Sequence, residues 1–405
     1  MAKRIVVCLD GTWNKPGQTE DGVATKTNVL KLYDALANGP DQVAGYIPGV
    51  GSDPGTKVRG GAFGWGLFEQ IRMGYRFVRE QLVPGDDIYM FGFSRGAYSA
   101  RSLAGMILRC GVVRRDVKSL MLPQLLAELL TTRDGDDSGI DVVDQAFALY
   151  KHAYDKDNRA EVEALKRQNC DDTGIRLVGV WDTVGSLGIP DDLVIPVLRD
   201  LDRKLDESHF GFLDTDLGAR VQAAYHALAI DEHRKPFLPT LWTEPPGATP
   251  RVNVAGTNVE QVWFAGAHSN VGGGYADAGL SDIALQWMIE RARGQGLDFA
   301  GTASAALHPD ATAERRDSLD EFIEPGAGRR NWLLTWIDRV VTRLVKKNRP
   351  IPEGSRIHAS VNTRLSAGAV SEPGKRAPYR PAATLKLAER DGVRVVDPQR
   401  YRIVV

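Results

Sequence analysis

The sequence predicts a three-layer α/β fold, in which a mostly parallel central sheet lies between helices. Several short runs are continuously apolar rather than alternating, which is typical of strands that are covered on both faces. These runs are residues 4–9, 87–93, 175–181 and 261–265. The stretches between them have the spacing of amphipathic helices, most clearly in residues 68–82 and 97–110. Strands that alternate with helices favour a parallel sheet with helices on both faces.

The chain is predicted to form one domain over residues 1–405, because it contains no internal repeat and no long low-complexity linker. Two segments interrupt the alternation of strands and helices. Residues 112–174 include a long, charged, helix-favouring stretch, which we interpret as a helical insertion over the sheet. Residues 302–354 are bounded by Pro and Gly and contain a basic helix, so we interpret them as a second insertion or a lid.

The composition excludes several classes of protein. The balance of 51 basic and 52 acidic side chains argues against a nucleic-acid partner, which requires an excess of Lys and Arg. The three cysteines are widely spaced without a CxxC pair, so they predict neither a zinc site nor a disulfide framework. The N-terminus lacks a secretory signal, and no apolar run is long enough to span a bilayer. We expect a cytoplasmic protein, with export only by a system that needs no signal peptide.

The strongest local motif is Gly92-Phe93-Ser94-Arg95-Gly96, which lies between a predicted strand and a predicted helix. This is the context of a nucleophile elbow, where a serine occupies a tight strand-to-helix turn and bulky side chains two residues away would clash. An ordinary glycine turn is the alternative interpretation. The motif predicts Ser94 as a nucleophile in an α/β-hydrolase-like sheet, with the N-terminus of the following helix near the developing negative charge.

A serine needs a base and an orienting acid, and in this architecture the chain order is Ser, acid, His. Asp182 is the first polar residue after an apolar strand in LVGVWDTVG, although it could instead cap the following turn. His268, in VWFAGAHSNVGGGY, follows another apolar strand and begins a glycine-rich loop. His358 is the main rival for the role of base, and a purely structural role for either histidine is the alternative. The predicted triad is therefore Ser94, Asp182 and His268.

The N-terminal motif CLDGTWN allows two interpretations. A phosphatase with an aspartate nucleophile would need Asp two residues before Asp10, where this chain has Cys8. The turn after the first strand fits a hydrolase better, because its backbone N–H groups at Gly11 or Thr12 can form an oxyanion hole together with the N–H of Arg95. Asp10 then organises the turn rather than acting as a catalyst.

Five motifs occur in a fixed order: CLDGTWN, FGFSRGAYSAR, VWDTVGSLG, HALAIDEHRKPF and VWFAGAHSNVGGGY. Together they resemble the DUF2235 family, the α/β-hydrolase catalytic domain of type VI secretion lipase effectors of the Tle1 class, from about Lys3 to Leu297. The resemblance implies a Ser/Asp/His hydrolase with phospholipase A-type activity, and by motif it places the triad on Ser94, Asp182 and His268. One departure is Asn270, at a position that is usually Asp in the family.

Residues 331–347, NWLLTWIDRVVTRLVKK, have the composition of a helix that lies at a membrane surface. Apolar residues recur at spacings of three and four, and Arg and Lys are interleaved with them. Such a helix could contact an anionic bilayer and serve as a lid over Ser94. The alternatives are a helix packed on the sheet and a contact between copies of the chain, since the sequence does not define the oligomeric state.

The leading functional hypothesis is a serine hydrolase that cleaves carboxylic esters. Within this class we favour a lipase or phospholipase A-like enzyme, so the expected partner is a lipid or ester substrate. It requires no metal and no organic cofactor. One alternative is a metal-dependent phosphoesterase that uses Asp10, Asp182 and His268. Another is a non-catalytic binding module of the same fold, against which the presence of all three triad residue types argues.

Overall fold

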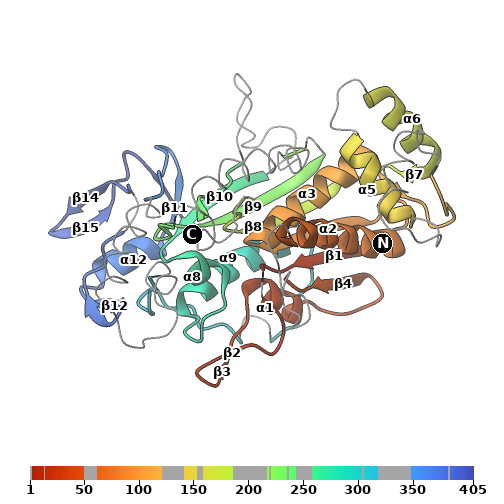
Figure 1. Cartoon of the computed structure of the whole chain (residues 1–405). Helices are drawn as coiled ribbons and strands as arrows, with labels where there is room; N and C mark the ends of the chain where they lie inside the picture. Colours follow the sequence, from red (N-terminus) through yellow and green to blue (C-terminus); the bar gives the residue numbers. More distant parts are fainter. Residues whose placement is uncertain are drawn as a thin grey trace, which may run out of the picture.

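The computed structural model describes residues 2–12, 14–49, 62–120, 141–152, 158–185, 217–218, 220–234, 237–242, 258–302, 305–317, 348–381 and 384–405. At its centre is an eight-stranded sheet (Figure 1), in which all neighbouring strands are parallel. In spatial order the strands are β16 (Arg402–Val404), β11 (Arg356–His358), β10 (Asn258–Phe264), β9 (Val221–Ala229), β8 (Ile175–Trp181), β5 (Asp87–Phe93), β1 (Arg4–Leu9) and β4 (Gln42–Ile47). The predicted α/β fold is confirmed.

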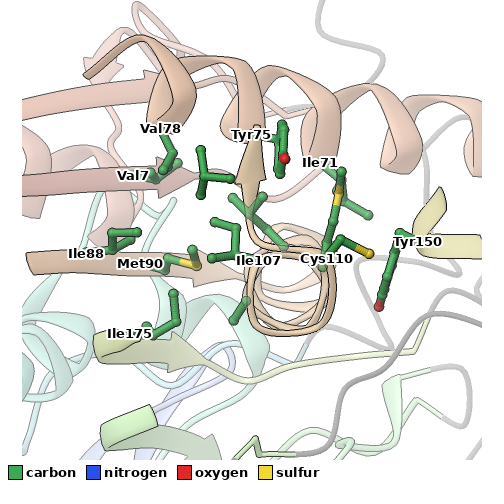
Figure 2. Packing of buried hydrophobic residues seen from close by; sticks show 14 of the residues in the cluster. Val7, Ile71, Tyr75, Val78, Ile88, Met90, Ile107, Cys110, Tyr150 and Ile175 are labelled. Atoms are coloured by element: carbon green, nitrogen blue, oxygen red, sulfur yellow. The ribbon is translucent and has the colours of Figure 1, made fainter. Parts of the chain in front are cut away.

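The sheet is buried on both faces, as its continuously apolar strands predict. Val7 and Met90 belong to a core shared with α2 (Ala62–Gln81), α3 (Arg95–Cys110) and α5 (Val142–His152). Figure 2 shows these two side chains in that core, together with Val78 of α2 and Ile107 of α3. The alternate residues of the same strands, such as Cys8 and Phe91, pack on the other side against α1 (Asn28–Ala35) and α9 (Gly279–Gly294). The helices predicted over residues 68–82 and 97–110 are α2 and α3.

Four strands of the sheet carry no clear sequence signal. From the sequence, the stretch around His226 is interpreted as helical or connecting, and this interpretation is wrong, because the stretch forms β9, VQAAYHALA. Alanine favours helices intrinsically, but here burial between two apolar strands decides the conformation. β4 contains a glycine, and β11 and β16 are only three residues long, too short for a periodicity to be recognised.

Residues 112–174 include two described helices, α5 and α6 (Arg159–Asn169), and the ends of the segment pair with each other. β6 (Val112–Val113) and β7 (Cys170–Asp171) form a short antiparallel ladder. The segment thus leaves and re-enters the α/β core at adjacent points, and its nature as an insertion stays a prediction. Whether the chain forms a single domain stays a prediction, and of the second predicted insertion only residues 302, 305–317 and 348–354 are described.

The C-terminal part of the chain adds a third apolar core beside β10 and β11. It is built from α12 (Ser360–Ser366) and two hairpins, β12 (Val370–Glu372) with β13 (Lys375–Ala377), and β14 (Leu387–Arg390) with β15 (Val393–Val396). The buried Arg364 stabilises this region, because its guanidinium donates to Glu372 and to the carbonyls of Ala311, Ala313 and Ser371. The remaining elements are the hairpin β2 (Thr19–Glu20) with β3 (Val23–Ala24), and α8 (His268–Gly272).

All three cysteines, Cys8, Cys110 and Cys170, are buried and form no disulfide. Among the described helices, none combines the length and the apolarity needed to cross a membrane.

The contact of α2 with α3 gives a test of core packing. Leu103 is fully buried, and a Cβ on Gly74 would lie 2.7 Å from its Cδ2 atom. We expect Leu103→Ala to lower the free energy of unfolding by about 2–5 kcal/mol. Adding Gly74→Ala to that variant should recover about 1 kcal/mol, because the new methyl enters the cavity and alanine favours the helix. In the wild-type background the same Gly74→Ala change should give no such gain. Urea denaturation of the four proteins measures the coupling, and strictly additive effects would contradict the contact.

Candidate active site

The site lies where the connections that leave neighbouring strands switch from one face of the sheet to the other. β1 and β5 are neighbours, but the chain leaves β1 toward α1 on one face of the sheet and leaves β5 toward α3 on the other. Ligands of open α/β sheets bind in the crevice at such a switch point, outside the carboxyl ends of the strands. The two loops meet here, because a Cβ on Gly11 would lie 3.2 Å from the Cβ of Ser94.

Ser94 occupies a strained turn between β5 and α3. Its φ of 58° and ψ of −123° are unusual for a residue with a side chain. The flanking glycines are required by sterics. A Cβ on Gly92 would lie 2.4 Å from the carbonyl oxygen of Gly96, and a Cβ on Gly96 would lie 2.3 Å from that of Leu9. The motif therefore forms the sharp strand-to-helix turn that its spacing predicts, rather than an ordinary glycine turn.

The structure brings Ser94, His268 and Asp182 into one chain of hydrogen bonds. His268 Nε2 lies 2.8 Å from Ser94 Oγ, and His268 Nδ1 lies 2.5 Å from Asp182 Oδ2. Asp182 directly follows β8, and His268 is the first residue of α8, just after β10. The three side chains are buried, with 8%, 4% and 0% of Ser94, His268 and Asp182 exposed. The imidazole contacts the rings of Phe93 and Phe237, whose centroids lie 4.6 and 4.9 Å away.

Asp182 has a partner that the sequence did not reveal. The guanidinium of Arg349 binds its carboxylate with two parallel bonds, 2.6 Å from Nη1 to Oδ1 and 2.9 Å from Nη2 to Oδ2. The backbone N–H of Ala229 also donates to Oδ1, at 3.0 Å. Burial by itself would raise the pKa of Asp182, but Arg349 and His268 outweigh it and hold the pKa below the ordinary range. Asp182 is therefore ionised and able to accept the Nδ1 proton of His268.

The surroundings keep His268 neutral. Burial lowers the pKa of its imidazole, and this effect exceeds the opposing effect of the Asp182 carboxylate. A second buried ion pair lies beside it, since Glu232 accepts from the His268 backbone N–H at 3.3 Å and binds Arg234 through Nε and Nη2. Burial opposes the ionisation of Glu232, yet Arg234 lowers its pKa to about 2. A neutral imidazole whose Nε2 faces the Ser94 hydroxyl has the arrangement of a general base.

His358, the rival histidine, does not belong to the hydrogen-bonded chain of Ser94, His268 and Asp182. His358 ends β11, where its ring stacks on Phe264 with centroids 4.7 Å apart and its Nδ1 lies 2.8 Å from Ser360 Oγ. His226 on β9 is closer to the acid, but its Nε2 accepts the backbone N–H of Thr183, at 3.0 Å. Burial lowers its pKa to about 3, so it remains a neutral structural acceptor.

Asp10 organises the loop after β1. Its Oδ1 accepts the Gly11 N–H at 2.7 Å, while its Oδ2 accepts the hydroxyls of Thr27 and Tyr46, both at 2.6 Å. Burial raises the pKa of Asp10 to about 6, against the effect of these hydrogen bonds. Because the Gly11 N–H is engaged by Asp10, Thr12 is the one that remains of the two donors predicted from the sequence.

The geometry does not favour the metal-dependent alternative. The carboxylates of Asp10 and Asp182 belong to separate networks, and both oxygens of Asp182 already bind a cationic side chain, Arg349. Within the described ranges, no group of three His, Cys, Asp or Glu side chains is arranged to hold a metal ion. The donor set of Asp10, Asp182 and His268 therefore does not fit a shared metal.

Asn270 fixes the position of α8. Its Oδ1 accepts the N–H of Ala267 at 3.2 Å and that of Arg316 at 3.0 Å, and its Nδ2 donates to the carbonyl of Glu314 at 3.0 Å. The side chain is buried. A carboxylate could keep the first two bonds but could not donate to Glu314, so the departure from Asp at this position has a structural reason.

This predicts that Asn270→Asp lowers the free energy of unfolding by about 1–3 kcal/mol, because the Glu314 carbonyl loses its donor and meets a buried negative charge. Asn362→Asp is the control for an amide whose oxygen accepts, from the N–H of Val396 at 2.8 Å, and whose Nδ2 donates to no group within the described residues. Asn362 is half-buried, so the comparison is made on the loss of the donor together with the burial of the charge. Thermal unfolding of both variants is the measurement. Equal losses of stability would show that the amide donor of Asn270 has no special weight.

The chain is similar to known proteins. Residues 3–291 match the family described as T6SS, Phospholipase effector Tle1-like, catalytic domain. The uncharacterized protein YEL023C of Saccharomyces cerevisiae is 28% identical over 261 residues, or 60% of this chain and 33% of that protein. The crystal structure of an uncharacterized protein from Pseudomonas aeruginosa has 17% identity and a TM-score of 0.42, covering 85% of this chain and 53% of that one.

This chain thus spans about a third of the yeast relative and about half of the bacterial one. The family match extends over more than half of the chain and includes the elbow, Asp182 and His268. It confirms the resemblance seen in the five sequence motifs. The chain belongs to the family of Tle1-like phospholipase effector catalytic domains.

Proposed function

We propose that this chain is a serine hydrolase that cleaves the carboxylic ester bonds of lipids, with phospholipase A-type activity. The observation that carries the proposal is the hydrogen-bonded chain from Ser94 through His268 to Asp182, placed on a strained elbow at the switch point of the sheet. Membership in a phospholipase effector family supports a lipid as the substrate. Membership in a family of secretion-system effectors also favours export by a secretion system.

In the proposed reaction, Ser94 Oγ attacks the ester carbonyl carbon while His268 Nε2 takes the hydroxyl proton. The negative charge of the tetrahedral intermediate is stabilised by the backbone N–H groups of Arg95 and Thr12. Collapse of the intermediate expels the alcohol, which receives the proton from Nε2, and leaves an acyl ester on Ser94. Water, activated by the same imidazole, then releases the fatty acid and restores the serine. Asp182 holds the imidazole in the tautomer with a proton on Nδ1.

The first test concerns the nucleophile. Ser94→Ala should abolish ester hydrolysis and labelling by a fluorophosphonate probe, because no other group on the elbow can form the acyl ester. The free energy of unfolding should change by no more than about 1 kcal/mol, since only one hydroxyl is removed. Chelators should leave the wild-type rate unchanged. Labelling that survives the substitution, or activity that a chelator removes, would overturn the serine mechanism.

The second test separates the two histidines. His268→Ala should be as damaging as Ser94→Ala, because members of a triad act as a unit. His358→Ala is the matched control, and it should keep most of the activity. Asp182→Asn should lower kcat by about 10⁴-fold, because the asparagine stabilises the wrong imidazole tautomer. Initial rates on p-nitrophenyl esters measure all three, and a large loss in the His358 variant alone would reassign the base.

Membrane contact through residues 331–347 is part of the proposal on sequence grounds alone, since this segment lies outside the described residues. Vesicle binding should rise with the anionic lipid content and fall with salt. Replacing Trp336 and Ile337 by Ser should reduce hydrolysis of vesicles much more than hydrolysis of a short soluble ester. Equal losses on both substrates, together with a lower melting temperature, would instead indicate a packed helix.

A further inference from the structure

Arg349 is a buried cation whose hydrogen bonds hold it against the carboxylate of Asp182. Only 1% of its side chain is exposed, and its guanidinium makes four hydrogen bonds. Two go to the two oxygens of Asp182, and the others go to the backbone carbonyls of Ala229 and Phe237. The carbonyl contacts fix the plane of the guanidinium, so the carboxylate that pairs with it is fixed as well.

The orientation of Asp182 decides which of its oxygens receives the imidazole. Oδ1 is held by Arg349 Nη1 and by the backbone N–H of Ala229, at 2.6 and 3.0 Å. Oδ2 is shared between Arg349 Nη2, at 2.9 Å, and His268 Nδ1, at 2.5 Å. Rotation of the carboxylate would break several of these bonds at once. Arg349 thus acts on the position of the imidazole through Asp182.

We propose that Arg349 is a positioning residue for the triad, which holds the Asp182 carboxylate toward His268 and offsets its negative charge. The proposal rests on the proposed function, because it assigns Arg349 a role in the reaction of that site. With the charge of Asp182 offset, protonation of the neighbouring imidazole gains less from the carboxylate. His268 consequently stays neutral, and able to accept the Ser94 proton, at lower pH than it would beside an unpaired carboxylate.

Other charged groups also act on this pair, and they remain in place when Arg349 is changed. Glu232 and Arg234 follow β9 in the chain, and they act on the pKa of His268 in opposite directions. His226 on β9 contacts the backbone N–H of Thr183, next to Asp182. Because these groups are unaltered, a change in the titration of His268 in an Arg349 variant reports on the guanidinium.

The test is the pH titration of the His268 ring, followed by NMR on the full chain with ¹⁵N-labelled histidine and assigned with a His268→Gln variant. In Arg349→Met we expect the midpoint to rise by about one pH unit, because the carboxylate is no longer offset. The acid limb of kcat/KM for a soluble ester should move to higher pH with it. At its optimum, kcat should fall between about tenfold and a thousandfold, less than for losing the carboxylate itself.

Arg364→Met is the matched control, since Arg364 is also fully buried and binds a carboxylate, that of Glu372, in the C-terminal core. Both variants should have lower melting temperatures, but only Arg349→Met should shift the His268 midpoint. An unchanged midpoint, with kcat per folded molecule equal to that of Arg364→Met, would overturn the proposal. It would leave the serine mechanism standing, because that mechanism is judged by Ser94→Ala.

Arg349→Lys is a second test of the positioning role, for the case in which Arg349→Met does not fold. Lysine keeps the charge but cannot bind both carboxylate oxygens in one plane. We expect a midpoint close to that of the wild type and a kcat at least about tenfold lower, with KM unchanged. A wild-type kcat in this variant would overturn the positioning role. If Ser94→Ala retained activity while the NMR midpoint still shifted, the serine mechanism would fail and the coupling of Arg349 to Asp182 and His268 would stand.

Discussion

The buried carboxylate of Asp182 is the constraint on which the rest of the site depends. It lies at the carboxyl end of a central strand, fully shielded from water, where an unpaired ion would be very unfavourable. Its stability requires a cation and several donors at fixed positions, and these are Arg349, the N–H of Ala229 and the imidazole of His268. Distant parts of the chain must therefore converge on one residue, and that convergence places His268 beside Ser94.

The elbow at Ser94 also depends on the structure packed around it. The conformation of Ser94 costs about 1–3 kcal/mol and persists only because the surrounding structure holds it. α3 can approach β1 closely only with glycine at position 96, and the loop after β1 reaches the serine in turn, through Gly11. The network around Asp10 fixes that loop. The proposed nucleophile and the proposed oxyanion donors are thus parts of one packed arrangement at the switch point of the sheet.

Sequence alone predicts those features that have a local cause. Ser94, Asp182 and His268 each follow an apolar strand, so the parallel topology brings them to one edge of the sheet, and the glycines around Ser94 follow from the steric demands of its turn. Arg349 has no such pattern. Its partner is 167 residues away, and nothing in its neighbourhood marks it as buried. β9 was missed for a related reason, because its alanines form a strand only between β8 and β10.

The site extends beyond the part of the chain that matches the family. The match ends at residue 291, yet Asp182 is held by Arg349 and the position of α8 depends on contacts of Asn270 with Glu314 and Arg316. Without those later residues the carboxylate would lose its cation and the helix that carries His268 would lose two of its anchors. The orientation of Asp182 and the position of the helix that carries His268 consequently depend in part on a region outside the shared motifs. Substitutions there would change the chemistry of the site while leaving all three triad residues intact.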